Sequence, residues 1–278
     1  MSTQSHDLQY IIELARGAGK LIRQRYGKVE RLTKTHIAAD QEAVTDADRE
    51  SQRFIVAGLK RRWPDDGIIG EESETGSSIT ADIPDPLARV WVIDPIDGTN
   101  NFIAGLGNFA VCIALLHKGH PILGIVYDVM RDQMYAAAQG EGCWLDNQRL
   151  SVLQSPLNDA SMLMLTSNLL NSAGHCPQWA SQFIAQTNWK VRMLGSAALE
   201  ATMVAAGVAH ASFTVNGKLW DVAAPAALVL EAGGILTDLT GKPLFPYNLR
   251  NYQGAKVPFI ASTPQAHAPL LDFLRRNP

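Results

Sequence analysis

Apolar residues recur at intervals of three and four along the first part of the chain, which predicts two amphipathic helices. The first runs from Leu8 to Tyr26 and ends near Gly27. The polar, irregular residues 28–43 are predicted to form a loop. The second helix is expected from Thr45 to Pro64, because Thr45-x-x-Asp48 has the form of a capping box and an apolar face follows it.

Short apolar runs separated by turn residues come next, and this pattern predicts strands. Gly67-Ile-Ile-Gly70 leads into Glu71-Glu72-Ser73, and residues 75–86, rich in Gly, Ser, Asp and Pro, are expected to form a surface loop. Val90-Trp-Val-Ile93 is continuous, β-branched and aromatic, as expected of a buried strand. An antiparallel meander is predicted over three further runs, residues 109–116, 121–127 and 133–138.

After residue 155 the pattern changes to strands that alternate with helices, which indicates an α/β half. The expected strands are residues 161–166, 190–194 and 210–215. The expected helices are residues 178–187, 197–207, 222–232 and 264–276. Since no flexible linker marks the change, we expect residues 1–155 and 156–278 to form two halves of one compact unit around a shared cleft.

Composition and charge narrow the class of protein. A chain of 278 residues that is 46% hydrophobic can bury a substantial core. A net charge of -3 without long runs of like charge argues against a general nucleic-acid or membrane-surface binder. The three cysteines are widely spaced and form no CxxC pair, which favours reduced thiols. With a polar N-terminus and no membrane-length apolar run, the protein is expected to be soluble and cytoplasmic.

Two acids, Asp94 and Asp97, follow the predicted strand Val90-Trp-Val-Ile93. Charged carboxylates at the end of a buried strand are costly unless a cation neutralises them. Gly98 lets the backbone come close to a ligand, and Thr99 offers a hydroxyl beside exposed amides. This stretch therefore predicts a magnesium site with a phosphate bound to it.

Three further acids are candidates for the same site: Asp48, Glu71 and Asp221. Glu71 follows a short apolar strand, as Asp94 does, so adjacent strand ends can bring the two together. Read alone, Asp48 and Asp221 are also explained as helix caps, and Glu71 as part of a charged loop edge. Pro225 supports a helix start at Asp221.

Other catalytic motifs are missing from the sequence. Clustered carboxylates without a nearby histidine favour magnesium or manganese over zinc or copper. The chain has no Walker lysine loop and no Gly-x-Ser-x-Gly elbow. Gly105-Leu-Gly107-Asn-Phe-Ala110 matches a dinucleotide-binding pattern only superficially, because a strand and not a helix is predicted after it.

Two long motifs carry a resemblance to a known family. Asp94-Pro-Ile-Asp-Gly-Thr-Asn-Asn-Phe102 resembles the first signature of the inositol monophosphatase family. Trp220-Asp-Val-Ala-Ala224, followed by Glu231-Ala-Gly-Gly234, is similar to its second signature. Shorter matches occur in the expected order at residues 44–48, 70–73 and 195–198. The resemblance covers nearly the whole chain and implies an α+β fold, the layered α/β/α/β/α sandwich of the inositol monophosphatase and fructose-1,6-bisphosphatase type.

The resemblance also implies a set of metal ligands. Glu71, Asp94 and the backbone carbonyl of Ile96 would hold one magnesium ion. Asp94, Asp97 and Asp221 would hold a second, with Asp94 as the bridge. A third, weaker ion would lie near Glu71. Lithium inhibition and a homodimer are further implications. The expectation of no nucleic-acid or membrane partner comes from the charge pattern and not from the resemblance.

Catalytic and substrate-binding roles follow from the same resemblance. Thr99, hydrogen-bonded to Asp48, would help to deprotonate a metal-bound water. The amides of Gly98 and Thr99 would receive the phosphate. The turn that faces the alcohol would consist of Gly195, Ser196 and Ala197.

Two features bear on the substrate. Asn100-Asn101-Phe102 lies closer to the Thr-Asn-Phe of inositol-type members than to the Lys-Glu-Phe of the nucleotidase branch. Thr214 stands seven residues before Asp221, where inositol-type members usually carry a glutamate that binds ring hydroxyls. The predicted substrate is therefore a small polyol or sugar phosphate. Histidinol phosphate and a 3′(2′),5′-bisphosphate nucleotide are alternative substrates, and a catalytically silent regulatory protein is the non-enzyme alternative.

Overall fold

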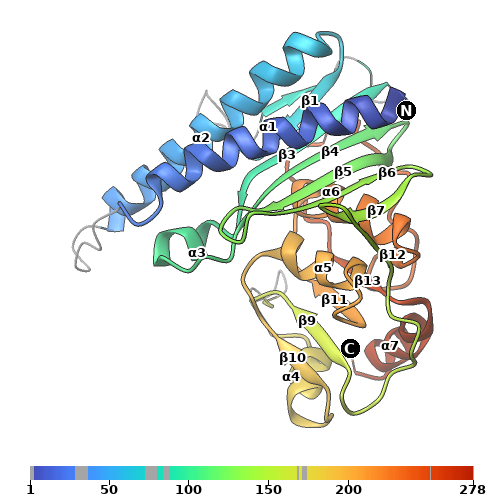
Figure 1. Ribbon diagram of the computed structural model, residues 1–278. Helices are drawn as coiled ribbons and strands as arrows, with labels where there is room; N and C mark the ends of the chain where they lie inside the picture. The colour runs from blue at the N-terminus through green and yellow to red at the C-terminus, as the bar shows by residue number, and fades with distance from the viewer. Residues whose placement is uncertain are drawn as a thin grey trace.

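The chain folds into five layers of helices and sheets. The computed structural model describes residues 3–28, 37–72, 80–83, 85, 88–167, 169–170, 174–250 and 252–277. Figure 1 shows the helices α1 and α2 on a first sheet, α5 and α6 beneath it, then a second sheet with α4 and α7. In layer order these helices are Thr3–Arg25, Ile37–Arg62, Ala197–Ala205, Leu219–Glu231, Gln178–Ala185 and Pro264–Arg276. The predicted α/β/α/β/α sandwich is confirmed.

Within the described residues, the first sheet has eight strands in the order β2-β1-β3-β4-β5-β6-β7-β8. Strand β1 is parallel to β3, and from β3 onwards the strands form the predicted antiparallel meander. In sequence order the strands are Gly67–Gly70, Thr80–Asp82, Arg89–Asp97, Ala110–His117, His120–Asp128, Gln133–Ala138, Gly142–Leu145 and Gln148–Leu150. The strand β4 after Gly107 confirms that the glycine-rich stretch there does not open a dinucleotide-binding helix.

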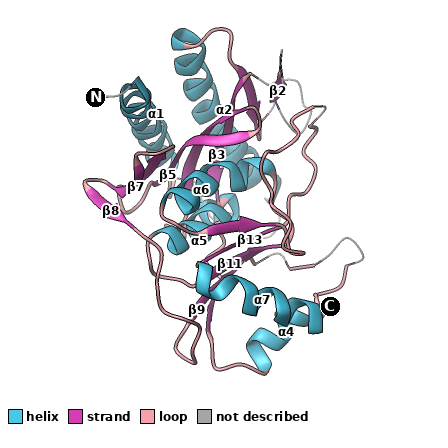
Figure 2. Ribbon diagram, turned by 90° about the vertical axis from the view of Figure 1, so that its right-hand side faces the viewer, coloured by secondary structure: helices cyan, strands magenta, loops and turns pink. Residues whose placement is uncertain are grey.

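The second sheet has five strands in the order β10-β9-β11-β13-β12. Strand β9 is parallel to β10 and β11, whereas β13 is antiparallel to β11 and β12. The strands β9 to β13 are Met162–Leu165, Lys190–Arg192, Ala211–Thr214, Ile235–Thr237 and Phe259–Ser262. Figure 2, turned by 90°, shows that the two termini lie at opposite ends of the stack.

Both faces of the first sheet are buried, which explains its continuous apolar strands. On β4, successive side chains point to opposite faces, as the pleat requires. Ala110, Cys112 and Ala114 contact the layer of α5 and α6. Val111, Ile113 and Leu115 contact the layer of α1 and α2. The long apolar run at residues 109–116 therefore forms a strand of a sheet that lies between two helical layers.

Helix α6 lies unusually close to the first sheet, because both surfaces carry small residues. A Cβ atom at Gly124 on β5 would come within 2.5 Å of the Ala224 carbonyl oxygen and 2.8 Å of the Ala227 Cβ. Glycine at this position is therefore required by the close backbone approach. The approach holds the first turn of α6, which carries Asp221, against the ends of the sheet strands.

The predicted start of the second helix is wrong. Helix α2 begins at Ile37, so residues 37–43 are helical and the Thr45-x-x-Asp48 segment lies inside the helix and not at its N-terminus. The physical reason is that residues 37–44 contain good helix formers and no Gly or Pro. Residues 29–36 of the predicted loop lie outside the described residues.

Two shorter predictions also need correction, and two strands lie outside the predicted elements. Residues 80–82, within the predicted surface loop, form the edge strand β2 by pairing with β1. Helix α6 starts at Leu219, so Pro225 lies inside the helix and not at its start. The three-residue strand β12 and the strand β13 were not predicted, because runs this short carry little periodic signal.

The two sheets divide the chain between Leu150 and Met162, where the halves 1–155 and 156–278 are predicted to meet. Helix α6 belongs to the second half but packs on the first sheet, so one core contains residues of both halves. The assignment of the halves as domains stays a prediction. Among the described residues, no helix has the length and apolar character needed to cross a membrane.

Candidate active site

Asp94 and Asp97 lie at the end of β3, where its pairing with β4 becomes irregular. Asp94 is opposite Cys112 and Asp97 is opposite Ala110, with a register shift between them. Pro95 cannot donate to the ladder, which accounts for the irregularity. The Asp94 Oδ1 accepts a hydrogen bond from the Ile96 amide at 3.0 Å, and this local turn brings both carboxylates to the same side.

Glu71 reaches the same place from the neighbouring strand. Gly70 on β1 pairs with Ile93 on β3, and the Glu71 amide donates to the Ile93 carbonyl at 3.2 Å. The prediction that adjacent strand ends bring Glu71 and Asp94 together is confirmed. Gln52 on α2 fixes this strand end, since its side chain donates to the Glu72 carbonyl at 2.6 Å and accepts from the Glu72 amide at 3.0 Å.

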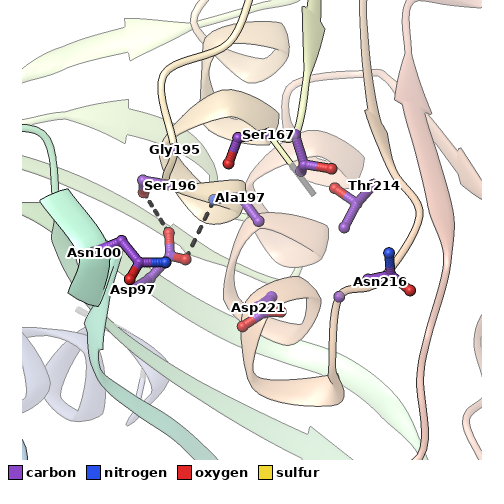
Figure 3. Close-up of a pocket in the computed structure, with 12 residues that line it drawn as sticks. Asp97, Asn100, Ser167, Gly195, Ser196, Ala197, Thr214, Asn216 and Asp221 are labelled. Carbon is purple, nitrogen blue, oxygen red and sulfur yellow. Dashed lines mark hydrogen bonds between the residues drawn. The ribbon is translucent and has the colours of Figure 1, made fainter. Parts of the chain in front are cut away.

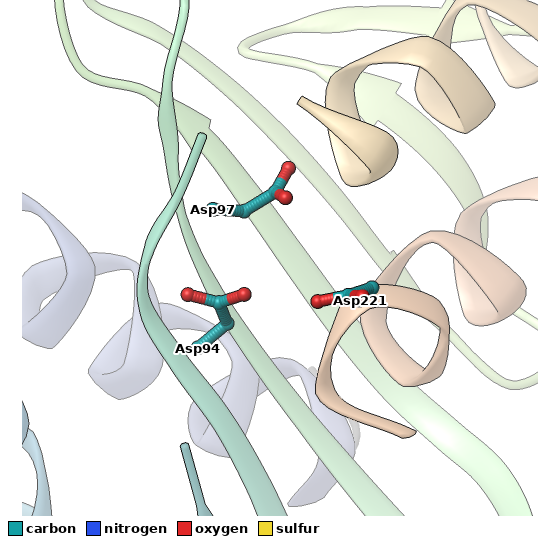
Figure 4. A group of neighbouring side chains, drawn as sticks. All are labelled: Asp94, Asp97 and Asp221. Carbon is teal, nitrogen blue, oxygen red and sulfur yellow. The ribbon is translucent and has the colours of Figure 1, made fainter. Parts of the chain in front are cut away.

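Asp221 comes from the opposite side, in the first turn of α6. The N-cap residue is Lys218, whose amide donates to the Asp221 Oδ2 at 2.7 Å. A helix therefore does start near Asp221, as the capping interpretation predicts. Asp221 is the third helical residue, however, and not the N-cap residue. Ligand oxygens of Asp94, Asp97 and Asp221 all lie within 4.8 Å of one another, as Figure 4 illustrates.

These acids repel one another in a buried environment. Burial, followed by the charge of Asp221, raises the pKa of Glu71 to about 8, and burial with the charge of Asp97 raises that of Asp221 to about 7. The pKa of Asp94 is raised well above its usual range, by burial and by the charges of Glu71 and Asp97. None of the ion pairs formed by the described residues involves these four acids. Oxygen donors with uncompensated negative charge fit a magnesium ion.

Asp97 is anchored by the N-terminus of α5. Its carboxylate accepts from the Ser196 hydroxyl and from the amides of Ala197 at 3.2 Å and Ala198 at 2.8 Å. Burial raises the pKa of Asp97, and these hydrogen bonds oppose the rise because they stabilise the charged form. Ser196 is also the N-cap of α5, since its hydroxyl accepts from the Leu199 amide at 3.3 Å.

Gly98 and Thr99 start the short helix α3 (Thr99–Ala104). Gly98 has a φ of 98°, which a residue with a side chain rarely adopts. The Thr99 hydroxyl donates to the Ile96 carbonyl at 3.0 Å, so the expected hydrogen bond from Thr99 to Asp48 is not formed. A hydroxyl at the first helical position can bend back to a preceding carbonyl, and here it does.

Asp48 lies on α2, four residues before Gln52, so both side chains face the end of β1. It is only 3% exposed, and its Oδ1 has no hydrogen-bond partner. Burial and the charges of Glu71 and Glu72 raise its pKa well above the usual range. A buried carboxyl with a free oxygen is suited to accept a proton or a hydrogen bond from a group that enters the site.

A pocket of about 170 Å³ opens beside Asp97 and Asp221, with Gly98 and the Gly195–Ala197 turn in its wall. Figure 3 shows that Thr214 on β11 and Ser167 after β9 also face it. The hydroxyls of Thr166 and Thr214 are buried and have no hydrogen-bond partner. The sequence pointed to Thr214, Ser196 and Asn100, whereas the other uncharged polar residues of the lining, Thr166, Ser167 and Asn216, carry no such signal in the sequence.

Comparison with known proteins identifies the family. Residues 4–273 match the model of the inositol monophosphatase family. The chain belongs to this family. It is similar to Nus factor SuhB of Pasteurella multocida, with 35% identity across 84% of this chain and 85% of that protein. It is also similar to inositol monophosphatase 1 of Sus scrofa, with 33% identity across 85% of this chain and 84% of that protein.

The fold agrees with solved structures of this family. An inositol monophosphatase from Zymomonas mobilis matches with a TM-score of 0.81 and 26% identity, covering 99% of this chain and 100% of that one. Family membership and the cluster of Asp94, Asp97 and Asp221 together make the chain a magnesium-dependent phosphoric monoester hydrolase.

Proposed function

We propose that this member of the inositol monophosphatase family hydrolyses the monophosphate ester of a small, uncharged polyol or sugar. The observation that carries the proposal is the lining of the pocket next to the acids. It offers the unpartnered hydroxyls of Thr166 and Thr214, together with hydroxyl and amide side chains of Ser167, Asn100 and Asn216. Groups of this kind donate to and accept from the hydroxyls of a polyol.

The charges of the pocket support a neutral alcohol. Among the described lining residues, the charged side chains are the acids Asp97 and Asp221. Carboxylates attract a cation that itself binds the reacting phosphate, but they repel a second phosphate that has no such ion. The proposal therefore ranks a monophosphate above a 3′(2′),5′-bisphosphate nucleotide, with histidinol phosphate as the remaining alternative.

The acids divide into two proposed ion sites. Glu71, Asp94 and the Ile96 carbonyl would hold one magnesium ion, and Asp94, Asp97 and Asp221 would hold the other. The mutual repulsion of these acids, described above, supports the assignment. A third ion near Glu71 is a further part of the proposal. The Ile96 carbonyl, which accepts from Thr99, has a second lone pair for a ligand.

The chain's own residues then perform the positioning and the proton transfer. When bound, magnesium neutralises the charge of the phosphate and lowers the pKa of the attacking water. The amides of Gly98 and Thr99, at the start of α3, donate to the phosphate oxygens. Thr99 orients the water, and the free Oδ1 of Asp48 accepts the proton. The Gly195–Ala197 turn and Thr214 hold the alcohol.

A panel of phosphate esters tests this function. Phosphate release is measured with and without magnesium for inositol 1-phosphate, glycerol 2-phosphate, fructose 1,6-bisphosphate, histidinol phosphate and adenosine 3′,5′-bisphosphate. The polyol monophosphates are expected to have the highest kcat/KM, and only with magnesium. A higher kcat/KM for the nucleotide or for histidinol phosphate would contradict the substrate class. A folded protein that releases no phosphate from any ester would favour the silent regulatory alternative.

Two implications of the resemblance are proposals of the same kind. Lithium should inhibit phosphate release at a fixed magnesium concentration, which the same assay measures. The homodimer is tested by light scattering of the purified chain, and a mass near 30.2 kDa would contradict it.

A further inference from the structure

Glu200 is a completely buried carboxyl that the reaction described above does not use. It lies on α5, one turn after the N-cap residue Ser196, and it is 0% exposed. Its Oε1 accepts from two successive backbone amides, that of Leu194 at 2.6 Å and that of Gly195 at 3.0 Å. One side-chain oxygen thus holds both amides of the turn that leads into the substrate pocket.

The other side of this turn is held by α3 and the segment that follows it, next to the proposed phosphate-binding amides. The Leu194 carbonyl accepts from the Asn101 Nδ2 at 2.7 Å and from the Asn108 Nδ2 at 2.9 Å. Gly195 has a φ of 77°, and a Cβ on it would lie 2.9 Å from the Asn101 Nδ2. Gly98 also approaches the turn, since a Cβ there would lie 3.2 Å from the Gly195 carbonyl oxygen. These contacts fix the position of the Leu194–Gly195 turn relative to residues 98–108.

The turn also determines where the N-terminus of α5 lies. Ser196, Ala197 and Ala198 follow it directly and donate the hydrogen bonds that anchor Asp97. Gly195, Ser196 and Ala197 line the pocket beside Asp97, as Figure 3 shows. A displacement of the turn would move an acid of the cluster and the alcohol side of the pocket together.

We propose that Glu200 is a positioning residue of this enzyme, which fixes the Leu194–Gly195 turn and through it both the orientation of Asp97 and the alcohol side of the pocket. The proposal rests on the proposed function for the role of the pocket, but the anchoring of Asp97 is independent of the substrate. Hydrogen-bonding partners of a metal ligand affect metal affinity and activity by about 10- to 100-fold when they are removed.

Three variants separate this role from a purely structural one. Glu200→Met keeps the length of the side chain and removes the acceptor. Glu200→Gln keeps an oxygen that accepts from both amides. Thr202→Val is the matched control, because Thr202 lies on the same helix, is 0% exposed and loses one hydrogen bond, to the Ala198 carbonyl at 2.7 Å.

Calorimetry measures magnesium binding, and thermal unfolding reports whether each variant is folded. KM and kcat are measured with two substrates, inositol 1-phosphate and 4-nitrophenyl phosphate. Glu200→Met is expected to weaken magnesium binding about tenfold and to raise KM for inositol 1-phosphate about tenfold. KM for 4-nitrophenyl phosphate, which has no polyol, should rise less. Glu200→Gln should restore both constants to within about threefold of the wild type, because only the acceptor is needed.

The proposal is overturned if Glu200→Met matches Thr202→Val in magnesium affinity and KM, or if a folded Glu200→Gln variant fails to restore them. If Glu200→Met does not fold, Asn108→Ala removes one donor to the Leu194 carbonyl from a partly exposed position. An unchanged KM for inositol 1-phosphate in that variant overturns the proposal. A wild-type chain that hydrolyses no ester would refute the proposed function, while the calorimetry would still decide the role of Glu200.

Discussion

Replacement of Asp221 by asparagine should stabilise the metal-free protein while it removes a proposed magnesium ligand. Asparagine has nearly the same shape and keeps an oxygen that can accept from the Lys218 amide, which lies 2.7 Å from the Asp221 Oδ2 in the wild type. The substitution removes the negative charge that lies beside Asp94 and Asp97. The change therefore tests whether the acids repel one another in the folded chain.

The sign and size follow from the pKa of Asp221. Burial and the charge of Asp97 raise it from 3.8 to about 7, so between these values the folded chain binds more protons than the unfolded chain. The free energy of unfolding therefore falls as the pH rises through this window. At 1.36 kcal/mol per pKa unit, the ionised group costs at most about 4 kcal/mol. Asp221 is partly exposed, and solvent screening leaves about 2 kcal/mol.

Thermal unfolding in EDTA at pH 8 measures this gain. Asp221→Asn should raise Tm by roughly 5 °C, and the gain should shrink as the pH falls towards the unfolded-state pKa. Added magnesium should raise Tm of the wild type and change that of the variant much less. Asp238→Asn is the control of opposite sign, since hydrogen bonds from Thr240 and Lys242 lower the pKa of Asp238 despite its partial burial. An Asp221→Asn variant that is no more stable than the wild type in EDTA would refute the reasoning.

Three further predictions concern the same site. Asp94→Asn should lower kcat at least about a hundredfold, because the proposed bridge between the two ions is lost, while the circular dichroism spectrum stays unchanged. A near-normal kcat would contradict that role. Magnesium should bind more weakly at pH 6 than at pH 8 and release protons on binding, since burial and the charge of Asp221 raise the pKa of Glu71 to about 8. Calorimetry in buffers of different ionisation enthalpy measures the number of protons released. Thr214→Glu should raise kcat/KM for inositol 1-phosphate relative to glycerol 2-phosphate by about tenfold, because a carboxylate accepts from two neighbouring ring hydroxyls, and an unchanged ratio would exclude Thr214 from the alcohol side.

The parts of the site that the sequence predicts are those encoded over a few neighbouring residues. Asp94 and Asp97 follow an apolar strand, and Glu71 follows another, so their proximity needs only a parallel pairing of adjacent strands. The fold class was implied by the resemblance of the two long motifs to the family, whereas continuous apolar runs such as residues 109–116 predict only that a strand is buried.

The parts that the sequence does not predict depend on contacts or conformations that no short motif encodes. Glu200 acts on Leu194 and Gly195 from one turn of α5, and in the sequence it reads as an ordinary helical glutamate. Thr166 faces the pocket only because β9 pairs in parallel with β11. The start of α2 is not evident from the sequence, because a polar segment without a clear apolar face is typical of a loop, although its residues are good helix formers.

The burial of α6 explains how the fold tolerates a cluster of mutually repelling acids. Most of the helix is buried, and Val222, Leu228 and Val229 are 0% exposed in a core that joins both sheets. Burial of each such side chain contributes about 1.5–3 kcal/mol, which together exceeds the cost estimated for the Asp221 charge. The helix is therefore held against the sheet by apolar contacts that do not depend on the acids. Asp97 is likewise fixed by the N-terminus of α5, so both carboxylates are held in position by contacts that do not involve a cation.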